Sequence, residues 1–134
     1  MGIDYGTKRI GIAATDPLKI IASGLQTVPN KEIFDFLKNY LAREEVDTIV
    51  VGEPQRSDGS LSPIQEKIND FVKKLKKDYP TIEITTFNEQ FSSQRASEII
   101  RMSGAKRKKR RDKALVDTVS AAVILQDYME ENHW

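Results

Sequence analysis

The spacing of the apolar residues changes once along the chain, near residue 30, and this change limits the fold more than any other feature. Before it, apolar side chains recur at every second position, as in residues 10–14, and Gly6 and Asp16-Pro17 mark turns. This period of two predicts three consecutive short strands, ending near residue 28. Beyond residue 30, segments with helical spacing alternate with short apolar runs. The chain is therefore expected to have an α/β fold, in which helices cover the faces of a mixed β-sheet.

The later elements follow from the same patterns. Thr48–Val51 and Ile82–Phe87 have the composition of strands, and Asn30 is expected to cap the first helix. The predicted order is β-β-β-α-β-α-β-α-α in one domain spanning residues 1–134. Residues 103–112 are expected to form a mobile basic loop. They are not a domain boundary, because the single helix that follows them could not fold alone. The predicted helices cover residues 31–44, 63–79, 93–102 and 113–129.

Two absences exclude whole classes of protein. The 134 residues contain no cysteine, which excludes a disulfide scaffold, a thiolate zinc site and a cysteine nucleophile. No apolar run approaches the roughly 18–20 residues of a membrane span, and Asp4 and Lys8 interrupt any N-terminal apolar segment. We therefore expect a cytoplasmic protein without a membrane partner.

The net charge of +1 conceals a strong local asymmetry. Residues 106–113 hold seven basic side chains and one acidic one, so the rest of the chain carries 14 basic and 19 acidic residues. A dense cationic segment can bind phosphates without sequence preference, whereas the alternative is a solvated loop or a localisation signal. The candidate nucleic-acid-binding residues are Lys8, Arg9, Lys106, Arg107, Lys108, Lys109, Arg110, Arg111 and Lys113.

Three carboxylates stand where ligand sites form in parallel sheets. Asp4 ends the first predicted strand, Glu89 follows the strand 82–87, and Asp117 lies early in the last helix among apolar residues. Ligand sites form at the carboxyl ends of parallel strands, so Glu89 fits such a site directly and Asp4 could reach it from the adjacent strand. Asp117 would have to arrive from a helix packed across the sheet. Clustered carboxylates repel one another unless a divalent cation joins them, and Mg²⁺ prefers such oxygen ligands. The loop 52–59 is a further candidate to line this site.

Several motifs together resemble one known family, the YqgF/RuvX family of pre-16S rRNA nucleases, which were once described as Holliday junction resolvase homologues. The resemblance covers nearly the whole chain. It implies an RNase H-like fold with a five-stranded mixed sheet, and Asp4, Glu89 and Asp117 as the catalytic, metal-binding residues. The matching motifs are Asp4-Tyr5-Gly6-Thr7-Lys8-Arg9-Ile10-Gly11, Val51-Gly52-x-Pro54, Asp58-Gly59, Asn88-Glu89, Val116-Asp117-Thr118-x-Ser120-Ala121-Ala122 and Leu125-Gln126-Asp127-Tyr128.

The chain departs from the family pattern in two places. Asn88-Glu89-Gln90 stands where the family usually has Asp-Glu-Arg, so an arginine near the glutamate is lost. Related resolvases often carry a fourth carboxylate three residues before the last one, and that position is Ala114 here. Both differences bear on how a second metal ion would be held.

The leading functional hypothesis is a Mg²⁺- or Mn²⁺-dependent phosphodiesterase that processes the 5′ end of precursor 16S rRNA by two-metal hydrolysis. The alternatives are a Holliday junction resolvase-type DNA endonuclease, which would need a symmetric dimer, and a non-catalytic RNA-binding or ribosome-assembly factor. A sugar kinase- or actin-like ATPase also uses an Asp-x-Gly-Thr motif, but it needs two such domains. Nucleic acid is the expected partner, ribosomal particles are a further candidate, and a monomer or weak dimer is expected.

Overall fold

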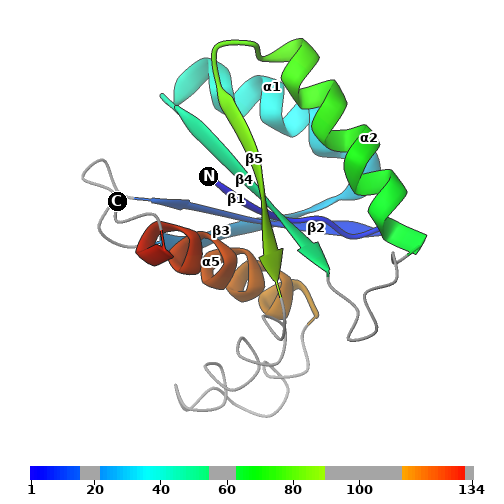
Figure 1. The fold of residues 1–134 in the computed structure, drawn as a ribbon, viewed down its shortest axis with the longest axis vertical. Coiled ribbons are helices and arrows are strands. Elements are labelled where there is room, and N and C mark those ends of the chain that lie inside the picture. The colour runs from blue at the N-terminus through cyan, green and yellow to red at the C-terminus, as the bar shows by residue number, and fades with distance from the viewer. Residues whose placement is uncertain (16–21, 55–62, 90–112, 132–134) are drawn as a thin grey trace.

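Five strands form one mixed sheet in the computed structural model, which describes residues 1–15, 22–54, 63–89 and 113–131 (Figure 1). The spatial order of the strands is β3-β2-β1-β4-β5. β1 pairs antiparallel with β2, and β2 with β3, whereas β1, β4 and β5 run parallel. The predicted five-stranded mixed sheet is confirmed. The strands are β1 (Gly2–Asp4), β2 (Arg9–Thr15), β3 (Ala22–Pro29), β4 (Thr48–Pro54) and β5 (Glu83–Glu89).

Helices cover both faces of the sheet (Figure 1). α1 (Ile33–Arg43), preceded by the 3-10 turn η1 (Asn30–Glu32), lies with α2 (Pro63–Asp78) on one face, and α5 (Lys113–Glu131) lies on the other. These bounds agree with three of the four predicted helices, and the predicted helix at 93–102 lies outside the described residues. Within the described residues, no helix combines the length and apolarity that a membrane crossing requires.

The prediction that Asn30 caps the first helix is wrong. Neither η1 nor α1 has a side-chain cap in the structure. Asn30 instead binds the turn between β1 and β2: its side-chain amide donates to the Gly6 carbonyl at 2.7 Å, and its backbone N–H donates to the Lys8 carbonyl at 3.0 Å. The side chain therefore fixes the turn at the carboxyl end of β1.

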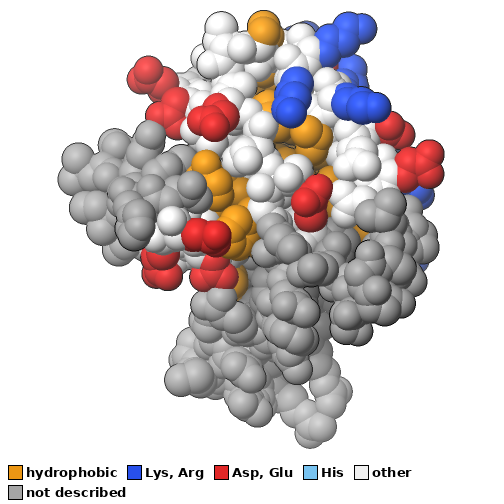
Figure 2. Space-filling view, viewed as in Figure 1, with side chains coloured by type: hydrophobic (Ala, Val, Ile, Leu, Met, Phe, Trp, Pro, Cys, Tyr) orange, Lys and Arg blue, Asp and Glu red, His pale blue; other side chains and the backbone are white. Residues whose placement is uncertain are grey.

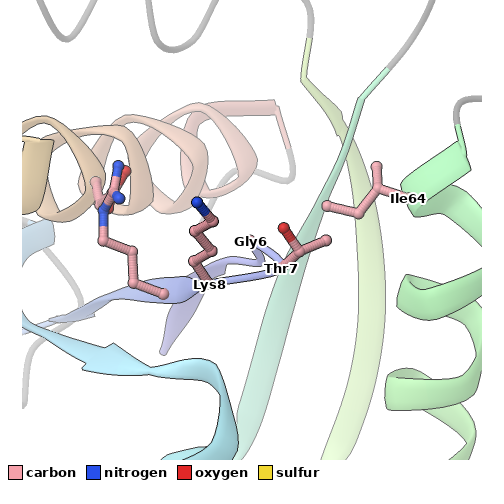
Figure 3. A pocket seen from close by; sticks show the side chains of 6 residues that line it. Gly6, Thr7, Lys8 and Ile64 are labelled. Atoms are coloured by element: carbon pink, nitrogen blue, oxygen red, sulfur yellow. The ribbon is translucent and has the colours of Figure 1, made fainter.

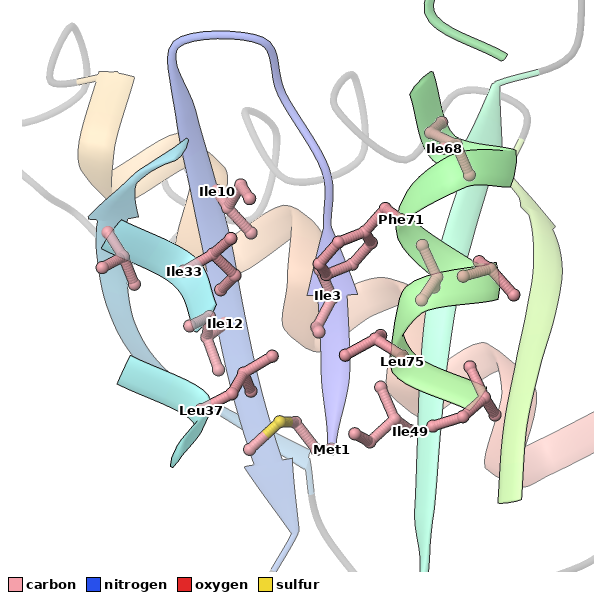
Figure 4. Close-up of a cluster of buried hydrophobic side chains, with 14 residues drawn as sticks. Met1, Ile3, Ile10, Ile12, Ile33, Leu37, Ile49, Ile68, Phe71 and Leu75 are labelled. Atoms are coloured by element: carbon pink, nitrogen blue, oxygen red, sulfur yellow. The ribbon is translucent and has the colours of Figure 1, made fainter. Parts of the chain in front are cut away.

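The larger core fills the space between the sheet and the helices α1 and α2 (Figure 4). Aliphatic side chains from alternate strand positions meet the inward faces of the two helices, as the helical apolar spacing predicts. Its buried members are Met1, Ile3, Ile10, Ile12, Val28, Ile33, Leu37, Ile49, Val51, Ile68, Phe71, Val72, Leu75 and Ile84.

On the opposite face of the sheet, α5 packs closely on the strands because the residues facing it are glycines. A Cβ atom on Gly2 would lie 2.8 Å from both the Ala121 carbonyl oxygen and the Leu125 Cβ, distances that real Cβ atoms almost never show. A Cβ on Gly11 would lie 2.1 Å from the Asp117 carbonyl oxygen. The backbone of α5 therefore lies directly on β1 and β2, which larger residues would not permit.

Replacing Gly11 by alanine is expected to force α5 away from the sheet. Overpacking of this kind costs about 1–3 kcal/mol, so the urea midpoint of unfolding should fall clearly. Gly24→Ala is the matched control, because its Cβ would lie 3.1 Å from the Thr118 Cβ and 3.2 Å from the Thr118 carbonyl oxygen, so that α5 would have to shift much less than for Gly11→Ala. Equal stability of Gly11→Ala and the wild type in urea denaturation would contradict this packing.

Candidate active site

Asp4 and Asp117 meet across a single glycine. Side chains two positions apart on a strand share a face, so Asp4 lies on the same face as Gly2, the face that α5 covers. Asp4 is paired in register with Gly11. The Asp117 Cβ lies only 3.1 Å from the position that a Gly11 Cβ would take. The structure therefore brings two of the three predicted carboxylates to the carboxyl end of β1.

Both carboxylates are partly buried, and Asp117 already has a cationic partner. The Arg9 guanidinium donates from Nε to Asp117 Oδ2 in a short ion pair, with side chains 37% and 19% exposed respectively. Arg9 is the first residue of β2, and the β1–β2 turn places its side chain next to Asp117 in the first half of α5. The Arg9 cation thus offsets the negative charge of the Asp117 carboxylate, which would otherwise repel other carboxylates nearby.

A pocket of about 320 Å³ opens at this point. Asp117 and Arg9 line it on the α5 side, and the turn residues Thr7 and Lys8 line it on the sheet side. Figure 3 shows the Lys8 side chain directed toward α5, with Ile64 of α2 across from Thr7. Lys8 is exposed, so its ammonium group can meet an anionic ligand in the pocket.

Ile64 is a pocket residue that the sequence did not indicate. Its apolar side chain fitted the buried stripe of α2, and only the order of the strands places the first turn of α2 beside the β1–β2 turn. The loop 52–59 was predicted to line the site, and the structure describes it only as far as Pro54. Within that part, the Glu53 carboxylate is directed toward α2, where it accepts a hydrogen bond from Gln65 Nε2 at 2.9 Å.

The third predicted carboxylate, Glu89, is described by its backbone. It is the last residue of β5, which ends two residues later than the predicted strand 82–87, and it pairs in register with Pro54. Position 89 is two residues beyond Phe87, whose ring lies 6.1 Å from that of Tyr128 on α5. Burial raises the pKa of Tyr128, and the Glu83 carboxylate raises it further. The backbone of residue 89 thus reaches the same sheet edge as Asp4.

The carboxylates offer the oxygen donors that Mg²⁺ or Mn²⁺ prefers. Among the side chains that the structure describes, no three acidic or histidine groups stand close enough to hold a metal ion. Asp4 and Asp117 supply two candidate carboxylate ligands, and Asp117 is already paired with the Arg9 guanidinium. Their oxygen donors are of the type that a hard divalent ion takes.

Only some of the predicted phosphate-binding residues lie within the part of the chain that the structure describes. Lys8 and Arg9 both line the pocket. Lys113 is the first residue of α5, and its side chain is not described. Residues 106–111 lie outside the described ranges, so their role stays a prediction.

Comparison with known proteins identifies the family. A family model described as "RuvX: Holliday junction resolvase" matches residues 1–131. The chain belongs to the RuvX family. Its resemblance to that family, drawn from scattered motifs, is thereby confirmed across nearly the whole length.

Relatives in the RuvX family match end to end. A protein of Christiangramia forsetii is 45% identical over 131 residues, covering 98% of this chain and 97% of its own. One from Porphyromonas gingivalis is 48% identical and covers 97% and 94%. One from Flavobacterium johnsoniae is 40% identical and covers 100% and 97%. All three carry the name "Putative pre-16S rRNA nuclease".

A solved structure shares the fold at low sequence identity. The Fowlpox virus resolvase, crystallised with its substrate Holliday junction DNA, superposes with a TM-score of 0.57 at 13% identity. The match covers 98% of this chain and 96% of the viral chain. The RNase H-like α/β fold that the family resemblance implied is confirmed.

The Arg9–Asp117 ion pair is expected to be readily exchanged. Because the Arg9 side chain is more than a third exposed, solvent screens the pair. A double-mutant cycle of Arg9→Ala and Asp117→Ala in urea denaturation should give a coupling energy of about 1 kcal/mol or less. A coupling well above 2 kcal/mol would instead mark a fixed structural bridge, unable to release Asp117 to a metal ion or Arg9 to a phosphate.

Proposed function

We propose that this RuvX-family chain is a metal-dependent nuclease that hydrolyses phosphodiester bonds in precursor 16S rRNA, at its 5′ end. The observation that carries the proposal is that Asp117 lines one pocket with Lys8 and Arg9 and packs on Gly11, the residue paired in register with Asp4. Carboxylates next to cationic side chains are what a metal-assisted reaction on a phosphate requires. The names of the relatives support precursor rRNA as the substrate.

The carboxylates have the role of holding the metal. Asp4 comes from a central strand and Asp117 from a helix seated on that strand, so the protein fixes their separation before any ligand binds. Glu89 would join them from the neighbouring carboxyl end of β5. A pair of Mg²⁺ or Mn²⁺ ions held by these residues would supply an activated water and would stabilise the leaving oxygen.

The cationic side chains have the role of holding the phosphate. Lys8 projects over the pocket from the β1–β2 turn, and Arg9, which lines the same pocket, would donate hydrogen bonds from its guanidinium to a phosphate oxygen. Residues 106–113 would add further contacts to the nucleic-acid backbone, which the remaining chain, with 14 basic and 19 acidic residues, would otherwise repel.

A junction-cleaving DNA endonuclease is the second candidate. It is favoured by the family description and by the fold shared with the viral resolvase. Paired cuts in a four-way junction require a symmetric dimer, so cleavage of junction DNA by a dimer would select this function over RNA processing. Binding of RNA without cleavage of any substrate would select the assembly-factor hypothesis.

The substitution Asp4→Asn tests the proposal, because it keeps the shape of the side chain and removes its charge. We expect the rate of metal-dependent cleavage of precursor 16S rRNA to fall by about 100-fold or more, since metal ions contribute several kcal/mol to such reactions. The control is Asp35→Asn, which removes an exposed carboxylate from α1 on the other face of the sheet.

Gel assays with Mg²⁺, Mn²⁺ or a chelator would measure the rate on precursor rRNA, single-stranded RNA and junction DNA. Equal metal-dependent rates for Asp4→Asn and Asp35→Asn would show that the site is elsewhere. Full activity of the wild type in the chelator would remove the metal from the mechanism.

A further inference from the structure

A second pocket lies on the other side of the β1–β2 turn from Asp117. It measures about 280 Å³, close to the lower end of the roughly 300–1,000 Å³ typical of small-molecule sites. We call it the aromatic pocket, and it is formed between the turn, the start of α1 and the middle of α2. The lining residues that matter to its chemistry are Tyr5, Phe34, Phe71, Lys67, Asp70 and Lys74.

Three aromatic rings form the apolar part of this pocket. The Phe71 ring is buried, with the Tyr5 centroid 5.0 Å away and the Phe34 centroid 5.6 Å away. Tyr5 and Phe34 are only partly buried, so they present ring surface to the pocket. Tilted rings supported by a buried third ring form a rigid surface on which a planar group can stack.

Two lysines give the pocket its charge. Lys67 and Lys74 lie two turns apart on α2, and the Lys74 ammonium stands 4.9 Å from the Phe34 centroid. Lys74 also pairs with Asp78 at 3.2 Å in an exposed pair that contributes little stability, so an incoming anion can take its place. Figure 2 shows Lys and Arg side chains gathered where α2 lies; its exposed lysines are Lys67, Lys73, Lys74, Lys76 and Lys77.

The aromatic pocket and the active-site pocket flank the same turn, because Tyr5 lines the first and Gly6 lines the second. Asp4 and Tyr5 are neighbours in sequence, so their side chains lie on opposite faces of the sheet, Asp4 toward α5 and Tyr5 toward the aromatic pocket. On α2, Ile64 lines the active-site pocket and Lys67, one turn later, lines the aromatic pocket. Asn30 fixes the intervening turn through its bond to the Gly6 carbonyl.

We propose that the aromatic pocket binds one unpaired nucleotide of the substrate strand, next to the nucleotides held at Asp4 and Asp117. The base stacks on Tyr5 and Phe34, and Lys67 and Lys74 contact the flanking phosphates. Asp70 accepts a hydrogen bond from the base. This inference rests on the proposed nuclease function, and it means that the enzyme selects a single-stranded segment beside the cleaved bond.

The test measures binding of fluorescent ten-nucleotide oligouridylate by anisotropy in a chelator, so that no cleavage occurs. The double variant Lys67→Glu/Lys74→Glu is compared with Lys73→Glu/Lys77→Glu, which changes the charge of the same helix equally at exposed positions outside the pocket. We expect the pocket variant to lose affinity about tenfold more than the control. Equal losses would overturn the proposal, because they would show general attraction to α2.

A second comparison isolates the stacking. An oligomer whose four central nucleotides lack their bases should bind the wild type at least about fivefold more weakly than intact oligouridylate. Tyr5→Phe keeps the ring and should keep this preference, whereas Tyr5→Leu should lose it. Thermal melting confirms that each variant is folded. The absence of any preference in the wild type would overturn the proposal.

The same assay with oligodeoxythymidylate shows whether the nucleotide is taken from RNA alone or also from DNA. Failure of the proposed function is distinguishable, because it is seen in cleavage by Asp4→Asn and not in metal-free binding. If Asp4→Asn loses cleavage while all pocket variants bind oligouridylate like the wild type, the nuclease proposal holds and the aromatic pocket proposal fails.

Discussion

Helix α5 lies on Gly2, Gly11 and Gly24 of three neighbouring strands, and this close approach decides where the candidate active site forms. With side chains at Gly2 and Gly11 the helix would stand further from the sheet, and Asp117 would move away from Asp4. Core packing resists continuous adjustment, so the separation of the two carboxylates is a property of the whole sheet-and-helix contact. The site is therefore preorganised by rigid elements on both sides.

β1 connects this packing to function, although it is only three residues long. Its central position buries Ile3 completely, while its carboxyl end carries Asp4 toward α5 and Tyr5 toward α1 and α2. The end of β1 thus contributes both Asp4 of the candidate active site and Tyr5 of the aromatic pocket. The turn that follows, fixed by Asn30, carries Lys8 and Arg9 back to Asp117. A substrate strand passing over this turn would meet cationic, acidic and aromatic side chains in succession.

Much of the fold could be predicted from periodicity, because buried strands and amphipathic helices leave strong local patterns, as in Ile49–Val51 and α2. The strand-end rule suggested a common site for Asp4 and Glu89, whereas the place of Asp117 beside Asp4 depended on the packing of the last helix, for which the family motifs gave the stronger indication. A distance across 113 positions of sequence has no local signature. Asn30 was predicted wrongly because capping and turn-binding use the same side chain, and tertiary contacts decide between them. Ile64 and the aromatic pocket could not be predicted, because they depend on how α2 lies beside the β1–β2 turn.

The central claim is that Asp4 and Asp117 bind the same metal ion, and anomalous diffraction from crystals soaked in Mn²⁺ tests it most directly. We expect an anomalous peak at the manganese edge in contact with carboxylate oxygens of both residues, with the Arg9 guanidinium displaced from Asp117. A map with no peak there, in which Arg9 still binds Asp117, would contradict the claim. So would a peak that contacts neither carboxylate.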